Sequence, residues 1–183
     1  TAIFNLLTGL NQKVSNYPGI TVEKKSSNIR VNNKDIILND YPGSYSIKSQ
    51  SIDESVVRNA VLSWISNEDS RPDGIIYVAD ITNLRRNLYF FSQLLPLDIP
   101  IIVLLNMSDI VDPNQLVDID KLKKNVNYLN LKSFASDNES EQFNFWFDTD
   151  KDNISHLINE IEKITLENKD IKIQIFSRSG VYE

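Results

Sequence analysis

Two short motifs in this chain combine residue types and a spacing that suit a nucleotide site. Residues 40–43 read Asp-Tyr-Pro-Gly, and the Asp40 carboxylate can hold a magnesium-bound water while the amide of Gly43 approaches a terminal phosphate. Residues 106–109 read Asn-Met-Ser-Asp. The Asp109 carboxylate can accept two hydrogen bonds from the edge of guanine, and adenine lacks the matching donors. Together the motifs predict a site for a guanine nucleotide with magnesium.

Both motifs also have ordinary structural explanations. An aspartate and a glycine at this spacing usually form a turn, and the second motif can be a polar cap on the next helix. Context favours function, because Asp40 follows a predicted strand at residues 35–38 and Asn106 follows an apolar run at residues 99–105. Asp80 also follows an apolar run. Ligands of α/β proteins bind where loops leave the carboxyl ends of strands, so these polar residues are site candidates.

Composition and charge restrict the class of protein. The chain has 183 residues, 41% of them hydrophobic, which suits one substantial core and is too few for two comfortable domains. A formal net charge of −6, spread along the chain, gives no attraction to nucleic acid. Cysteine is absent and His156 is the single histidine, which excludes disulfides and thiolate metal sites. Because no apolar run approaches the roughly 20 residues of a transmembrane helix, we expect a soluble, cytoplasmic domain.

The amino-terminal part predicts a helix followed by a hairpin. Apolar residues recur at helical spacing over residues 2–8, and Gly9 is placed to close that helix. A polar stretch follows. Strand-like segments around residues 21–24 and 29–31 then lead through an Asn-Asn-Lys turn into the strand at residues 35–38.

The rest of the chain alternates strands with helices. Apolar residues at helical spacing predict helices over residues 56–65, 84–95 and 154–165. Near-continuous apolar runs at residues 74–79 and 99–105 predict strands covered on both faces. Alternating phenylalanines at residues 143–147 indicate a strand or loop that packs one face on the core, with a partner surface as the less favoured alternative. This order is typical of a doubly wound, mostly parallel α/β sheet flanked by helices.

Further segments extend the pattern around the two motifs. They are Asn5, Thr8, Gly9 and residues 16–23, 40–46, 53–54, 80–88 and 106–109. From residue 1 to about residue 135 the chain thereby resembles the GTPase domain of the ferrous iron transport protein B family, of which the run at residues 80–88 is distinctive. The resemblance implies a cytoplasmic P-loop-type G domain. In the whole protein it would be fused to a helical regulatory segment and a transmembrane iron permease, at the cytoplasmic face of the bacterial inner membrane.

The resemblance also implies ligands and the residues that hold the metal. The ligands would be GTP or GDP with Mg²⁺, and K⁺ is a further cation of the family. Thr1 and Thr21 would coordinate Mg²⁺, Thr21 would sense the terminal phosphate, and Asp40 would hold the metal through a water. Gly43 would begin the second switch segment. Ser44 stands where many small GTPases keep a water-orienting glutamine, so hydrolysis would be slow and driven by positioning and charge.

The base pocket follows from the same resemblance. Asn106 and Asp109 would read guanine. The last motif of the family, normally Ser-Ala, corresponds best to Phe134 and Ala135, so Ala135 would line the base without its usual serine neighbour.

A G domain needs its first strand in the middle of the sheet, and no element above supplies it. Residues 171–176 alternate like a strand and follow a predicted helix. One hypothesis is a single, circularly permuted G domain over residues 1–183, in which residues 171–183 supply the first strand and a degenerate phosphate loop. The alternative is an unrelated tail or an incomplete amino end.

Under the permutation hypothesis the phosphate loop is chemically poor. Glu183 stands where a lysine neutralises phosphates, and Tyr182 where a glycine lets the backbone approach them. Gly180 stands at the position of the family's potassium-binding asparagine. The sequence predicts a domain that binds GTP or GDP weakly and hydrolyses GTP slowly in the control of ferrous iron uptake. The alternative is a non-hydrolysing pseudo-GTPase or structural module.

Overall fold

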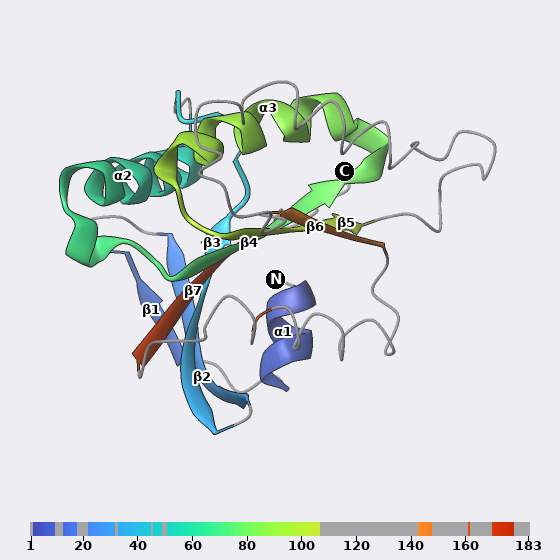
Figure 1. Ribbon diagram of the computed structural model, residues 1–183. Helices are drawn as coiled ribbons and strands as arrows, with labels where there is room; N and C mark the ends of the chain where they lie inside the picture. Colours follow the sequence, from blue (N-terminus) through green and yellow to red (C-terminus); the bar gives the residue numbers. More distant parts are fainter. Residues whose placement is uncertain are drawn as a thin grey trace, which may run out of the picture.

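The computed structural model describes residues 2–9, 13–17, 22–31, 33–44, 46–48, 51–106, 143–147, 161 and 170–177. In these residues seven strands form one sheet in the order β1-β2-β3-β7-β4-β5-β6 (Figure 1). The strands are β1 (Lys13–Asn16), β2 (Glu23–Val31), β3 (Lys34–Pro42), β4 (Gly74–Asp80), β5 (Ile101–Asn106), β6 (Phe143–Phe147) and β7 (Asp170–Ser177). The described helices are α1 (Ala2–Thr8), α2 (Ile52–Ser66) and α3 (Leu84–Leu94), with short 3-10 turns η1 (Glu68–Ser70), η2 (Ile81–Asn83) and η3 (Leu95–Leu97).

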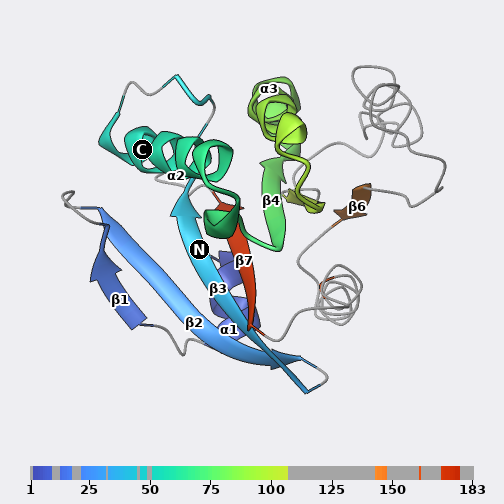
Figure 2. The same ribbon diagram turned by 60° about the vertical axis from the view of Figure 1, so that its left-hand side comes forward.

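The sheet is antiparallel at one end and parallel over the rest. β1 pairs with β2, and β2 with β3, in antiparallel fashion, whereas β3, β7, β4, β5 and β6 run parallel. Parallel strands need both faces covered. Helices α2 and α3 lie on one face and α1 on the other (Figure 1), and Figure 2 shows α2 over β3 and α3 over β4. The predicted doubly wound, mostly parallel α/β fold is confirmed.

Each face of the sheet has its own apolar core. On the face of α1, the fully buried Phe4 packs with alternate isoleucines of β7 and with Ile36 and Leu38 of β3. On the opposite face, side chains of α2 and α3 pack on β4 and β5. Ile161 is helical and fully buried in the α1 core, and it is the one residue of the predicted last helix, 154–165, that the structure describes.

Strand β7 occupies the middle of the sheet. It pairs in parallel with β3 along its whole length and with β4 through Gly74–Tyr77. Where β7 begins, Asp73 clips it to the start of β4, because the Lys172 N–H donates to the Asp73 carboxylate (2.7 Å) and the Asp73 N–H donates to the Lys172 carbonyl (2.8 Å). The predicted central position of residues 171–176 is therefore confirmed.

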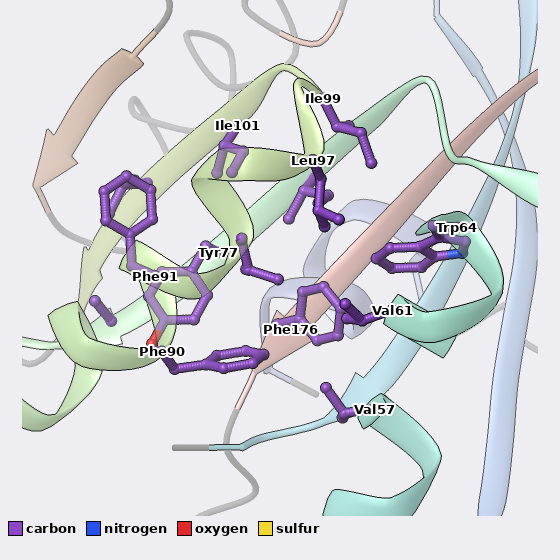
Figure 3. Packing of buried hydrophobic residues seen from close by; sticks show 14 of the residues in the cluster. Val57, Val61, Trp64, Tyr77, Phe90, Phe91, Leu97, Ile99, Ile101 and Phe176 are labelled. Carbon is purple, nitrogen blue, oxygen red and sulfur yellow. The ribbon is translucent and has the colours of Figure 1, made fainter. Parts of the chain in front are cut away.

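An aromatic row lies beneath the carboxyl end of β7. Tyr41 of β3, Phe176 of β7 and Tyr77 of β4 stand at one register across three neighbouring strands. The ring centroids of Tyr41 and Phe176 are 5.3 Å apart, and Phe90 of α3 meets Phe176 edge to face at 5.8 Å. Figure 3 shows Phe176 between the side chains of α2, including Trp64, and those of α3. Such aromatic pairs add stability beyond the area that they bury, so the row joins β3, β7 and β4.

Several local predictions agree with the structure and others differ. The helix at residues 2–8 is α1, and Gly9 closes it with a positive φ of 59°, which glycine adopts without strain. The hairpin around Asn33 is present, but its strands run the full lengths of β2 and β3 rather than as short segments. Strand β1 was not predicted, because all its residues are exposed and give no hydrophobic alternation.

The elements α3 and β6 were predicted, but some of their details differ or lie outside the described residues. The helix over residues 84–95 is α3, but its buried face centres on Asn87, Phe90, Phe91 and Leu94, while Leu84 and Leu88 lie at the margin of the core. Residues 143–147 form β6, a strand parallel to β5. Which face of β6 packs on the core is outside the described side chains.

Candidate functional site

Four candidate residues gather at one edge of the sheet. Because β3, β7, β4 and β5 are parallel, their carboxyl ends lie at the same edge. Asp40 lies two residues before the end of β3, and Gly43 follows that strand directly. Asp80 ends β4 and Asn106 ends β5, and these two residues are register partners. The end of β7 at Ser177 lies between the β3 pair and the β4 and β5 pair.

Asp40 is buried and sits inside its strand. Its exposed fraction is 7%, and its carbonyl accepts a 3.1 Å hydrogen bond from the Tyr17 hydroxyl. The sequence placed Asp40 after a strand at residues 35–38, but β3 continues to Pro42 because Tyr41 and Pro42 keep their pairing with Phe176 and Ser177. The buried Asp40 lies near the carboxyl end of β3, at the edge where doubly wound sheets bind their ligands, so it stays a functional candidate.

The loop after β3 is folded on itself and tied to α3. Ser44 is 8% exposed, and its hydroxyl donates to the Ser46 carbonyl (2.8 Å) and accepts from the Ser46 N–H (3.3 Å). The Ile47 N–H donates to the Gln93 Oε1 of α3 at 2.8 Å. The Ser44 hydroxyl is thus engaged within its own loop, and the side chain that holds the loop comes from a distant helix.

The run at residues 80–88 shapes the turn from β4 into α3. The Asp80 carboxylate accepts from the N–H (2.9 Å) and the hydroxyl (2.6 Å) of Thr82. The Asn87 side-chain amide donates to the carbonyls of Asp80 (3.4 Å) and Asn83 (2.9 Å), and the Tyr77 hydroxyl donates to the Asn87 carbonyl (2.8 Å). These contacts make Asp80, Thr82 and Asn87 parts of one hydrogen-bonded turn, and the pairing of β4 with β5 places Asp80 beside Asn106.

Other predicted site residues lie outside the part of the chain that the structure describes. They are Thr1, Thr21, Asp109, Ala135 and the proposed phosphate loop after Ser177. Of the base-reading pair, only Asn106 is placed. Among the described residues no group of three or more acidic or histidine side chains forms a metal site by itself. The described helices include none long and apolar enough to cross a membrane.

Tyr17 belongs to this edge and was not predicted as a functional residue. It is 8% exposed, and its ring lies against that of Tyr41 with centroids 5.4 Å apart. Burial, helped by the neighbouring Tyr41 and Asp40, raises the pKa of Tyr17, so its hydroxyl keeps its proton and remains a donor. The sequence offered only a tyrosine followed by a proline and a glycine, which does not by itself indicate a functional residue.

Comparison with known families agrees with this arrangement. Residues 1–142 match the family model described as ferrous iron transport protein B. The chain belongs to this family. It is 42% identical over 123 residues to the Fe(2+) transporter FeoB of Salmonella typhimurium and 36% identical over 124 residues to that of Leptospira biflexa. Each match covers 67% of this chain but only 16% or 17% of the relative, so the chain spans about a sixth of those proteins.

Solved structures of the family share the fold. The G domain of T. maritima FeoB matches with a TM-score of 0.63 and 27% identity, covering 87% of this chain and 88% of that one. The G domain of Methanococcus jannaschii FeoB matches with a TM-score of 0.60 and 28% identity, covering 90% and 88%. The cytosolic domain of T. maritima FeoB in a GDP form matches with a TM-score of 0.69 and 26% identity, covering 99% of this chain and 62% of that one. The chain is therefore a FeoB G domain with the P-loop GTPase fold.

Proposed function

We propose that this domain binds GTP and GDP with Mg²⁺ at the carboxyl edge of the sheet. The observation that carries the proposal is the meeting of Asp40, Gly43, Asp80 and Asn106 at that edge, on both sides of the end of β7. This is where doubly wound sheets bind their ligands. Support comes from family members whose structures are described as GDP and GMPPNP forms.

The described donor at this edge suits Mg²⁺, because a buried carboxylate such as that of Asp40 is a hard oxygen ligand that this ion prefers. The sequence offers threonine hydroxyls as further oxygen ligands. Thr1 and Thr21 would bind it directly and Asp40 through a water. When bound, the ion would neutralise charge on the phosphates. Because Gly180 stands in place of the family's asparagine, we propose no K⁺ requirement.

Hydrolysis by this domain should be slow. In the described part of the second switch segment, Ser44 replaces the usual glutamine, and its hydroxyl is hydrogen-bonded to the backbone of Ser46. The remaining contributions would be positioning and charge, which are weaker without a residue that orients the attacking water. A phosphate loop with Glu183 in place of lysine would weaken binding further, because a carboxylate repels phosphates.

A second candidate function is a pseudo-GTPase that keeps the fold and reports through protein contacts. The same two residues favour it, Glu183 and the self-bonded Ser44. Under either function we propose that the domain works in the cytoplasm, as part of a larger ferrous iron transporter with a regulatory helical segment and a membrane permease. We propose no nucleic-acid partner.

Calorimetric titration with GDP, GTP and ATP in Mg²⁺ tests the proposal. The expected result is that GDP and GTP bind and that ATP does not. Asp109→Asn sharpens the test, because the asparagine amide offers a donor where guanine also has a donor, whereas xanthine has an acceptor there. The affinity of the variant for GDP should fall at least tenfold, and its affinity for xanthosine diphosphate should rise.

A matched control is Asp98→Asn. Asp98 is exposed and has a positive φ of 53°, a conformation that asparagine tolerates, so the same chemical change should leave all affinities unaltered. Equal binding of ATP and GTP would contradict the base-reading role. Failure of the parent chain to bind any nucleotide would select the pseudo-GTPase.

A further inference from the structure

Two side chains of opposite charge are paired across neighbouring strands at the candidate site. In the antiparallel pair of β2 and β3, Lys25 is the register partner of Asp40. Directly paired residues point to the same face of a sheet, with Cβ atoms about 5 Å apart, and opposite charges at such positions attract. A lysine carries its ammonium on a flexible four-carbon stem, which spans this distance. The pairing therefore brings a positive charge to the carboxylate of the site.

Both side chains lie on the face of the sheet that α1 covers. Leu38, two residues before Asp40 on β3, belongs to the core of that face. Ile29, four residues after Lys25 on β2, packs against the same core. Because side chains alternate between the two faces along a strand, residues an even number of positions apart share a face. The alternation on each strand thus agrees with the pairing between them.

Lys25 and Asp40 form the charged part of an otherwise neutral row across the sheet. From β1 to β5 the row of register partners is Val14, Lys25, Asp40, Ile175, Ile76 and Ile102. The three isoleucines are buried, and Figure 2 shows β2, β3 and β7 side by side. Glu23 shares a strand and a face with Lys25, but it is exposed, so water weakens its attraction. Along this row, the charge opposite to that of Asp40 is supplied by Lys25.

We propose that Lys25 is a counter-charge of Asp40 in the nucleotide-free domain and that Mg²⁺ competes with it for this carboxylate. The competition rests on the proposed function, in which Asp40 holds Mg²⁺ through a water. Lys25 is half-buried, where charges interact more strongly than in bulk water. Its ammonium repels the metal ion and attracts phosphates, so it weakens Mg²⁺ binding and favours a nucleotide that arrives without the metal.

The first test is calorimetric titration of Lys25→Met with GDP, in Mg²⁺ and in a chelator. Methionine removes the ammonium and keeps an unbranched stem. We expect GDP affinity in the chelator to fall about two- to fivefold, the range for a partly exposed ion pair. The factor by which Mg²⁺ raises GDP affinity should grow by a similar amount. An unchanged or smaller factor would overturn the competition.

The matched control is Lys24→Met. Lys24 is also half-buried and its loss changes the net charge equally, but it points to the opposite face of β2. Its GDP affinity and its Mg²⁺ factor should both stay within about 1.5-fold of the parent values, a range below the effect of a paired charge. Equal changes in the two lysine variants would mean that net charge alone acts, which would overturn the role of Lys25.

Urea unfolding of the nucleotide-free, metal-free chain at low salt separates this inference from the proposed function. Lys25→Met should lower the urea midpoint in the parent chain and lower it less in Asp40→Asn, because the asparagine has no charge to pair. Lys24→Met should have the same effect in both backgrounds. If the parent binds no nucleotide but this coupling is found, the proposed function and the competition fail and the counter-charge stands. If the effects of Lys25→Met and Asp40→Asn simply add, the counter-charge is wrong whatever the chain binds.

Discussion

At the scale of residues, tyrosines that lie in the core or at its margin make the stability of the domain fall at alkaline pH. Burial raises the pKa of Tyr41 to about 12 and raises the pKa values of Tyr17 and Tyr77 as well. In the unfolded chain a tyrosine titrates near pH 10. Above that pH the unfolded state loses protons that the folded state retains, so the free energy of unfolding falls as pH rises.

We therefore predict a stability plateau below about pH 10 and a decline as pH rises towards 12. Each buried tyrosine contributes up to about 1.4 kcal/mol per pH unit in that window. Urea unfolding at several pH values measures the slope. Tyr41→Phe should reduce it, and Tyr89→Phe, on the exposed face of α3, should not. An identical slope in Tyr41→Phe would contradict the assignment.

The sequence predicted residues better when their chemistry was local. Asp40, Gly43 and Asn106 were found because their motifs follow strands, and the structure places all three at one edge. Tyr17 was missed because it is joined to the site by a hydrogen bond to Asp40, a residue 23 positions away in the sequence. No pattern of spacing or composition encodes such a contact.

At the scale of elements, a side chain of α3 holds the loop after β3 by a hydrogen bond. The Gln93 Oε1 accepts the N–H of Ile47, 46 residues earlier, and Ile47 packs against the core formed by α2 and α3. The sequence could predict α3 from its periodicity, but not this contact, because glutamine on a helix is ordinarily solvated. Strand β1 escaped prediction for the related reason that its residues are all exposed.

Gln93→Leu tests this tether. Loss of the acceptor should cost about 1 kcal/mol in the free energy of unfolding and should speed amide exchange at Ile47. Gln93→Glu keeps an acceptor oxygen of nearly the same length, so it should preserve slow exchange. Exchange at Ile47 that is equally fast in both variants would show that side-chain volume, and not the hydrogen bond, holds the loop.

At the scale of the whole molecule, the last described strand completes the core. Alternating isoleucines at residues 171, 173 and 175 predicted a strand, and the need of a G domain for a central strand predicted its place. Its central place could be predicted because a G domain without that strand would have two unpaired strand edges inside its sheet, and the structure places the strand between β3 and β4. The phosphate loop that this hypothesis assigns to residues 177–183 stays a prediction.

The central position of β7 makes its apolar residues decisive for stability. Ile173 is fully buried between β3 and β4, and its neighbour Lys172 is exposed on the same strand. Ile173→Ala should lower the free energy of unfolding by about 2–5 kcal/mol, the range for a large-to-small change in a core. Lys172→Ala should stay within about 0.5 kcal/mol. Urea unfolding followed by tryptophan fluorescence measures both changes in stability, because the ring centroid of Trp64 lies 6.1 Å from that of Phe176 in β7.

Removal of residues 170–183 is the stronger form of the same prediction. Without β7, strands β3 and β4 each lose a row of backbone hydrogen bonds, and the cores on both faces of the sheet lose the side chains that β7 supplies to them. We expect the shortened chain to lack cooperative unfolding. An edge strand could be deleted at a much smaller cost, so cooperative unfolding of the shortened chain would mean that β7 is not integral to the sheet.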